Sequence, residues 1–198
     1  MSDVPSTPEN PAALTILARL RAETRPYHDA LEAGAFNESL RVGAPTAAGT
    51  AQFLERMYGF LQPYEAALRA HEGELGAAWE LPQRYRAHLI PEDLGRSADD
   101  PGLPLCPTMP PLHTVPQLLG ALYVMEGSTL GGQVINRQLE RAGIPLRRYF
   151  SGYGERTGPM WKTFGQLLTA AATPATADEI VASAARTFQH LDAWINQP

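Results

Sequence analysis

Hydrophobic residues recur at three- and four-residue spacing along most of the chain, which is the period of an amphipathic α-helix. The sequence shows neither the alternation that indicates strands nor an internal repeat at a solenoid period. The pattern predicts helices, the third of them short and interrupted, over residues 11–34, 46–75, 81–96, 114–143, 160–172 and 176–194. We therefore expect an all-α fold.

Residues with known end preferences agree with these boundaries. Thr46 and Thr176 are suited to cap helix N-termini, because a threonine hydroxyl accepts hydrogen bonds from free backbone amides. Pro116 falls in the first turn of the helix that begins near Thr114, where proline is favoured. Pro63 should kink the second helix. The buried stripe predicted for the last helix is Ile180, Val181, Ala184, Phe188, Leu191 and Trp194.

Two segments rich in proline lie outside these helices. Residues 1–10 are polar and predict a loose N-terminal tail. Residues 98–113 contain five prolines and predict a loop or extended connector. Because neither segment resembles a linker between domains, we expect a single domain over residues 11–198.

Composition narrows the classes of protein that remain. With 44% hydrophobic and 19% charged residues, the chain can bury a core of normal size. A formal net charge of -5 and the lack of a basic run argue against a nucleic-acid partner. Cys106 is the only cysteine, which excludes an internal disulfide and thiolate metal clusters and fits a reducing compartment. Because we find neither a secretion signal nor a membrane-spanning stretch, we expect a cytoplasmic protein.

The fourth predicted helix carries Gly127, Gly131 and Gly132, although each helix-interior glycine costs about 1 kcal/mol relative to alanine. Gly127 and Gly131 are one turn apart, and Val134 and Ile135 continue the same face. A face without side chains lets a flat molecule approach the backbone. The glycines could equally serve close helix–helix packing or a kink between two helices, and their spacing leaves these alternatives open.

The first predicted helix carries a histidine with charged neighbours on its face. Glu32 lies four residues after His28, so its carboxylate can accept the imidazole Nδ1–H and leave Nε2 free for a metal. Arg21 lies two turns, or roughly 10 Å, before His28 and could pair with a ligand carboxylate, as could Arg25. An ordinary His–Glu surface pair and a solvated helix face remain alternatives. No P-loop, dinucleotide fingerprint, HExxH or paired CxxC motif offers a competing site.

The segments LRAETRPYHDALE (20–32) and YVMEGSTLGGQVINRQ (123–138) together resemble the heme oxygenase family, and the second resembles its bacterial, phytochrome-associated branch. The resemblance implies a helical bundle that holds heme between a proximal N-terminal helix and a glycine-kinked distal helix. His28 matches the proximal heme-iron ligand and Glu32 the carboxylate that hydrogen-bonds it. Gly127 and Gly131 match distal-helix glycines that lie against the heme face.

The resemblance extends to residues near the heme propionates and to residues on the distal side of the heme. Arg21 matches a basic residue that pairs with a heme propionate, and Lys162 matches a second. Ser128 stands where many family members have an aspartate that anchors a water network, so the resemblance counts it with His28 and the two glycines among the catalytic positions. The family's further C-terminal arginine aligns with Gln166 or Gly165. Tyr153 and Phe164 lie in the region that supplies pocket aromatics.

The resemblance implies an enzyme that opens the heme ring to biliverdin and releases carbon monoxide and ferrous iron. Heme is then both substrate and cofactor, dioxygen is the oxidant, and electrons come from a separate donor such as a ferredoxin or reductase. The product would supply the bilin chromophore of a bacteriophytochrome. Two alternatives remain: a heme-binding or carrier protein without turnover, and a helical bundle that binds another ligand or a partner protein.

Overall fold

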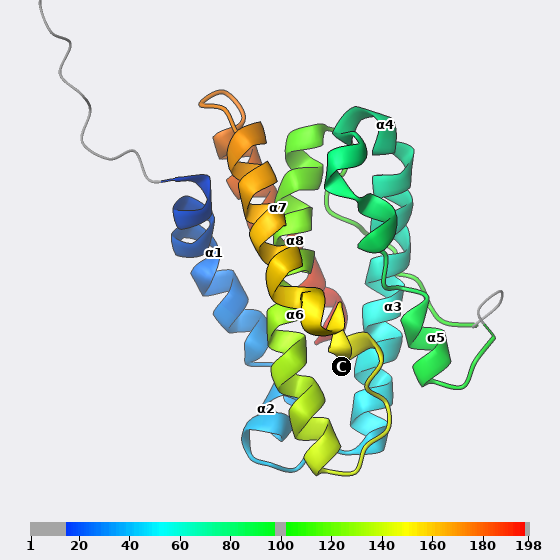
Figure 1. Cartoon of the computed structure of the whole chain (residues 1–198). Coiled ribbons are helices and arrows are strands. Elements are labelled where there is room, and N and C mark those ends of the chain that lie inside the picture. The colour runs from blue at the N-terminus through cyan, green and yellow to red at the C-terminus, as the bar shows by residue number, and fades with distance from the viewer. Residues whose placement is uncertain (1–14, 98–101, 197–198) are drawn as a thin grey trace, which may run out of the picture.

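All regular structure is helical in the computed structural model, which describes residues 15–97 and 102–196, and no strand occurs within those ranges (Figure 1). The α-helices are α1 (Ile16–Glu32), α2 (Ala35–Arg41), α3 (Ala47–Ala70), α4 (Glu72–Leu75), α5 (Leu89–Asp93), α6 (Val115–Arg141), α7 (Thr157–Ala171) and α8 (Ala177–Ile195). Short 3-10 turns are η1 (Ala77–Trp79), η2 (Leu81–Gln83), η3 (Tyr149–Ser151) and η4 (Gly154–Arg156). The prediction of an all-α fold is confirmed.

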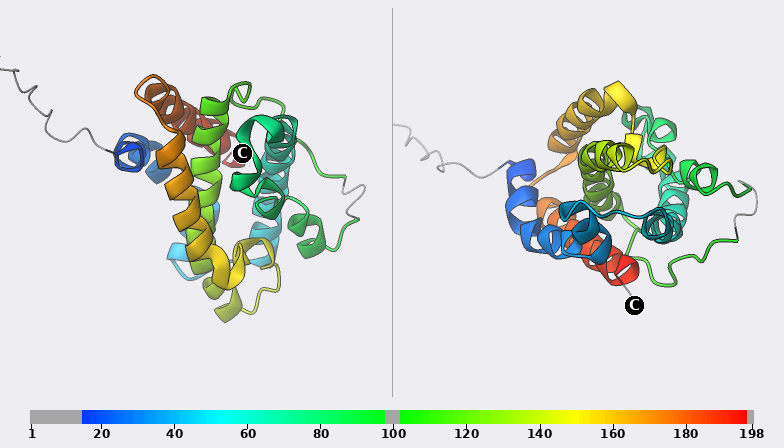
Figure 2. Two further views of the ribbon diagram at one scale, coloured as in Figure 1. Left: turned by 45° about the horizontal axis from the view of Figure 1, so that its top comes forward. Right: turned by 90° about the horizontal axis from the view of Figure 1, so that it is seen from below.

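Helix α6 runs through the middle of the molecule, and the other long helices surround it (Figure 1). It packs along α8 and also contacts α7, while α1 packs against both α8 and α7. Helix α3 lies on the far side of α6 from α1, with α4 and α5 beside it (Figures 1 and 2). Within the described part of the chain, no helix combines the length and apolar character that a bilayer crossing requires.

Of the two predicted caps, Thr46 makes the expected hydrogen bond, whereas Thr176 occupies the N-cap position of α8 without making one. The hydroxyl of Thr46 accepts a hydrogen bond from the amide of Gly49, and Thr114 caps α6 in the same way. Thr176 makes no such bond to α8. Its hydroxyl instead accepts from the amide of Thr173, because the turn before α8 occupies it locally.

The N-terminal third of the chain differs from the prediction in its helix boundaries. Helix α1 ends at Glu32, and Gly34, which was expected to end it, directly precedes the unpredicted helix α2. Helix α3 passes through Pro63 without interruption. The predicted tail, residues 1–10, and the start of the first predicted helix lie outside the described residues, as do residues 98–101 of the predicted connector.

Helices α6 and α8 approach each other closely because one residue at their contact is glycine. A Cβ atom at Gly120 would lie 2.7 Å from the backbone nitrogen of Ala184 and even closer to the carbonyl oxygen of Ile180. On the facing side, the hydrophobic stripe predicted for α8 is buried throughout. The close spacing of α6 and α8 therefore depends on the absence of a side chain at Gly120.

We predict that Gly120→Ala destabilises the protein by about 1–3 kcal/mol, because backbone atoms of α8 cannot move away from the new methyl group without repacking. Urea unfolding followed by circular dichroism measures the change. Gly158→Ala is the matched control, since a Cβ at this helical glycine of α7 meets nothing within 4 Å. Equal stabilities of the two variants would contradict the packing role of Gly120.

Candidate functional site

A cavity of about 160 Å³, partly open to solvent, lies between α1, α3, α6, α8 and the turn η3. Phe53 and Met57 of α3, Phe150 of η3 and Phe188 of α8 give it an apolar lining. The cavity therefore suits a largely apolar ligand.

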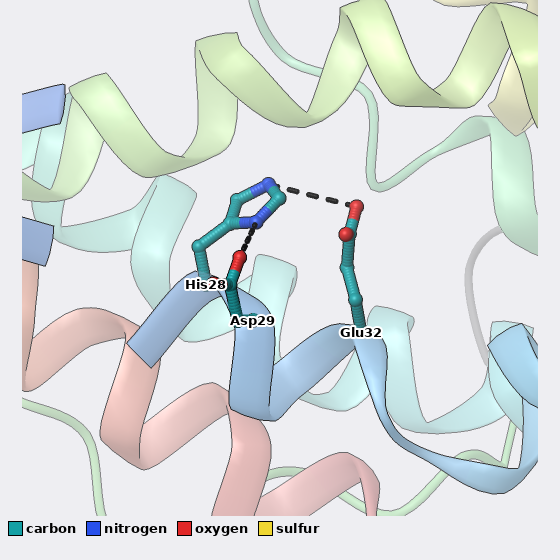
Figure 3. Close-up of side chains that lie close together, drawn as sticks. All are labelled: His28, Asp29 and Glu32. Atoms are coloured by element: carbon teal, nitrogen blue, oxygen red, sulfur yellow. Dashed lines mark ion pairs between the residues drawn. The ribbon is translucent and has the colours of Figure 1, made fainter. Parts of the chain in front are cut away.

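Helix α1 presents His28 at one wall of this cavity, with carboxylates on either side (Figure 3). The side chain is 50% exposed, and its ring meets the ring of Phe188 edge-on at 5.7 Å. Its Nε2 lies 3.6 Å from an oxygen of Glu32, and its Nδ1 lies 3.7 Å from an oxygen of Asp29. The three side chains are all exposed, and their ligand atoms lie within 4.8 Å of one another.

The expected contact between Glu32 and Nδ1 of His28 is wrong. A carboxylate one turn along the helix reaches the outer ring nitrogen, whereas the adjacent Asp29 reaches the inner one. Both distances are longer than a hydrogen bond, so neither carboxylate holds the imidazole in place.

Helix α6 forms the wall opposite α1, and two of its glycines there are not closely packed. A Cβ at Gly131 would meet nothing within 4 Å, and one at Gly127 would meet only the ring of Trp161, at 3.8 Å. Gly132 differs, because its Cβ would lie 3.0 Å from the carbonyl oxygen of Phe150. Helix packing therefore accounts for Gly132 but not for the other two, and α6 is continuous through all of them.

Only one of the two predicted apolar neighbours of these glycines lines the cavity. Ile135 does so, whereas Val134 is 48% exposed and is not part of the lining. The expectation that Val134 continues the face that lines the cavity is thus wrong. Consecutive residues point about 100° apart around a helix, so Val134 turns outward where Ile135 turns inward.

None of the three predicted basic residues lines the cavity. Arg25 is exposed and lies 3.5 Å from a carboxylate oxygen of Asp29. Arg21 and Lys162 are also exposed. Arg21 lies beside Tyr123, one turn of α6 before the first cavity glycine, and Lys162 directly follows the tryptophan that contacts that glycine.

The predicted pocket aromatics do not line the cavity, and their neighbours in sequence do. Phe164 is fully buried in the core, and Tyr153 donates a hydrogen bond of 2.6 Å to Glu126. Tyr149 and Phe150 line the cavity instead. The turn η3 places them there, and the sequence pattern gives no period from which a turn's side-chain directions could be read.

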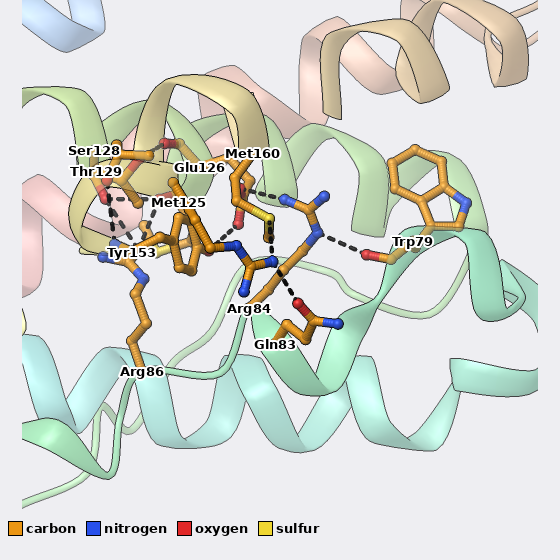
Figure 4. A network of polar contacts seen from close by, with 12 residues as sticks. Trp79, Gln83, Arg84, Arg86, Met125, Glu126, Ser128, Thr129, Tyr153 and Met160 are labelled. Atoms are coloured by element: carbon orange, nitrogen blue, oxygen red, sulfur yellow. Dashed lines mark hydrogen bonds and ion pairs between the residues drawn. The ribbon is translucent and has the colours of Figure 1, made fainter. Parts of the chain in front are cut away.

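Behind α6 lies a buried ionic network that the sequence did not indicate (Figure 4). Glu126 is 2% exposed and forms an ion pair with Arg84, which also donates from Nε to the carbonyl oxygen of Trp79 at 2.7 Å. Burial and the neighbouring carboxylate of Glu126 raise the pKa of Tyr153, so this phenol stays a hydrogen-bond donor. The network ties the segment before α5 to α6.

A second buried arginine from the same segment reaches the cavity itself. Arg86 is 4% exposed, and its Nη2 donates to the carbonyl oxygen of Met125 at 2.8 Å and to the hydroxyl of Ser128 at 3.3 Å (Figure 4). Ser128 also lines the cavity and donates to the same carbonyl oxygen at 2.7 Å. The backbone amides of Arg86 and Ala87 donate to the buried carboxylate of Glu65. Sequence analysis missed Arg86, which lies in a region predicted as an interrupted helix.

Comparison with known proteins identifies the fold. No family model and no curated protein sequence matches the chain. Solved heme oxygenases do match it over 92% of its length: that of Leptospira interrogans (20% identity, 99% of that chain, TM-score 0.76) and that of Neisseria meningitidis in NO- and CO-bound forms (22%, 91%, 0.74). Heme oxygenase-2 of Synechocystis sp. PCC 6803, solved with heme and NO, is similar (21%, 84% of that chain, 0.75). The chain thus has the heme oxygenase fold, as the sequence resemblance implied.

We predict that alanine changes stability differently at two adjacent glycines of α6. Gly131→Ala should raise the free energy of unfolding of the ligand-free protein by about 1 kcal/mol, because it adds helix propensity where there is space. Gly132→Ala should give no such gain, because its methyl group presses on η3. Thermal unfolding of both variants without ligand measures this difference, and a loss of stability in Gly131→Ala would contradict the open space seen there.

The buried ion pair gives a further prediction. Glu126→Leu should destabilise the protein by about 3–5 kcal/mol, because the charge of Arg84 is then buried without its partner. Urea unfolding tests this value. Glu140→Leu, which removes an exposed carboxylate paired with Arg147, is the control and should leave stability nearly unchanged. Similar effects of the two substitutions would show that the network contributes no more than a surface pair.

Proposed function

We propose that this protein is a heme oxygenase, which opens the heme ring to biliverdin and releases carbon monoxide and ferrous iron. One observation supports the proposal most strongly. The wall that faces His28 across the cavity is a helix with two central glycines, of which Gly131 meets open space and Gly127 meets only the ring of Trp161 at contact distance. That slot occurs in a fold shared with solved heme oxygenases.

The residues present fit heme in shape and in polarity. Heme is flat and apolar in its middle, which agrees with the aromatic lining and with the bare backbone of α6. Heme is anionic at one edge, and Arg21 of α1 and Lys162 of α7 are exposed cations. Long basic side chains can reach a carboxylate while their heads stay in water. These two residues are the proposed partners of the propionates, and Arg25 is a further candidate.

His28 is the proposed axial ligand of the heme iron, and its chemistry requires a neutral imidazole nitrogen. When bound, heme supplies the iron that activates dioxygen. Glu32 would then accept a hydrogen bond from the ring nitrogen that does not bind the metal, after the imidazole turns from its present orientation. On the other wall, the backbone at Gly127 and Gly131, with Ile135 beyond them, would exclude most approaches to the ring edge and so limit which carbon reacts.

Ser128 is the proposed distal polar group at the position where many heme oxygenases have a carboxylate. Its hydroxyl donates to the carbonyl oxygen of Met125 and accepts from Arg86, so its orientation is fixed. A hydroxyl held in this way can hydrogen-bond a water molecule in the cavity but does not act as a carboxylic acid at neutral pH. Protons would therefore arrive through ordered water rather than from this side chain.

The proposed reaction needs electrons from outside the chain, because the sequence contains no flavin or iron–sulfur motif. A ferredoxin or a reductase in the cytoplasm is the proposed donor. The segment YVMEGSTLGGQVINRQ resembles the phytochrome-associated branch of the family. We therefore propose a bacteriophytochrome as the acceptor of the bilin.

A second candidate function is a heme-binding or carrier protein without turnover. The observation that favours it is Ser128, since this position lacks a carboxylate. Incubation of the purified protein with heme, dioxygen and a ferredoxin system separates the two functions. Loss of the Soret band with growth of a bilin band supports the enzyme, whereas a stable Soret band supports the carrier.

We predict that His28→Ala abolishes the histidine-ligated heme spectrum and reduces bilin formation by at least about 100-fold, because the axial ligand is lost. Absorption spectra of the ferric complex and chromatography of the bilin measure both effects. His190→Ala is the matched control, since this histidine contacts the carbonyl oxygen of Thr108 and does not line the cavity. Ligation and product like those of the unaltered protein in His28→Ala would refute the assignment.

A further inference from the structure

Arg86 lines the cavity, and its guanidinium has one hydrogen-bond donor that no described residue uses. Its residue is 4% exposed, and its Nη2 is occupied by Met125 and Ser128. Its Nε is buried and has no hydrogen-bond partner among the described residues. A buried N–H without a partner is unfavourable, and in native proteins such groups commonly bind a ligand or an ordered water molecule.

The charge of Arg86 is also not paired with a carboxylate in the described part of the chain. The nearest buried carboxylates are engaged elsewhere: Glu126 pairs with Arg84 and Tyr153, and Glu65 accepts from two backbone amides and from Arg69. Aromatic rings cover the guanidinium instead. The ring of Tyr149 lies 5.2 Å from it and the ring of Tyr153 lies 5.8 Å away.

A buried, unpaired cation with a free donor attracts negative charge strongly, because the surrounding dielectric constant is low. Arg86 lines the cavity next to Ser128 on the α6 wall, opposite the wall that carries His28. In the proposed function, the anionic edge of heme pairs with Arg21 and Lys162 instead. Arg86 and Ser128, which both line the cavity, are therefore available to a second, smaller ligand.

We propose that Arg86, oriented by Ser128, binds a small anionic ligand on the face of heme opposite His28. This inference rests on the proposed function and deepens it, because it assigns the distal positive charge to a residue outside α6. A cation here stabilises negative charge on a small oxygen ligand, a task for which Ser128 has only a neutral hydroxyl. Arg86 and Ser128 together supply the polar contacts that a carboxylate at position 128 would otherwise provide.

Azide binding to the ferric heme complex tests this assignment without turnover. Arg86→Leu should weaken azide binding at least about tenfold, because a charge-assisted hydrogen bond and an unpaired cation are lost. Affinity for imidazole, a neutral ligand, and for heme itself should change by less than about threefold. Arg156→Leu is the matched control, since this exposed arginine contacts Gln83 and does not line the cavity.

Two further variants keep the test decisive if Arg86→Leu does not fold. Arg86→Lys retains the charge but lacks Nε, so its azide affinity should fall between those of the unaltered protein and the leucine variant. Ser128→Ala frees the guanidinium and should also weaken azide binding. Unchanged azide affinity in these variants would overturn the proposal, as would an equal loss of heme affinity, which would make Arg86 a propionate ligand. Absence of heme binding by the unaltered protein would overturn the proposed function as well.

Discussion

The buried ion pair between Arg84 and Glu126 is the interaction on which the candidate site depends. It joins the irregular segment between α4 and α5 to the middle of α6, and Tyr153 joins the turn after α6 to the same carboxylate. A charge pair with both side chains almost fully buried tolerates little displacement, because either partner alone would be strongly destabilised. The segment is thereby fixed in the register that brings Arg86, two residues further, to the cavity wall.

The glycines of α6 have three different structural roles at different positions along the helix. Gly120 lets α8 approach, Gly132 lets η3 approach, and Gly127 and Gly131 leave the cavity wall bare. The first two glycines are compensated by packing contacts, which return part of the helix propensity that they cost. The other two are not compensated in the ligand-free protein. The same residue type therefore stabilises the fold at one turn of the helix and prepares a ligand site at another.

Sequence periodicity was sufficient for the fold and for the two walls of the candidate site. The long helices, the cap at Thr46, the start of α6 near Thr114 and the stripe of α8 follow from local sequence, and so do the positions of His28 and the α6 glycines. The missed features depend on contacts between distant parts of the chain. Arg86 reaches Ser128 across 42 residues, and no local pattern distinguishes it from a solvated arginine. Val134 was misplaced by a smaller error, a rotation of one residue around the helix.

The uncompensated glycines have a consequence for the amount of protein in a cell. A chain that gives up about 2 kcal/mol of helix propensity at Gly127 and Gly131 populates its unfolded state more than an alanine-containing chain would. A ligand that fills the cavity binds only the folded state and restores this stability by mass action. Proteases remove unfolded chains, so the lifetime of the protein should lengthen when its ligand is plentiful and shorten when it is scarce. A bare helix face thus links the abundance of the protein to the supply of its ligand.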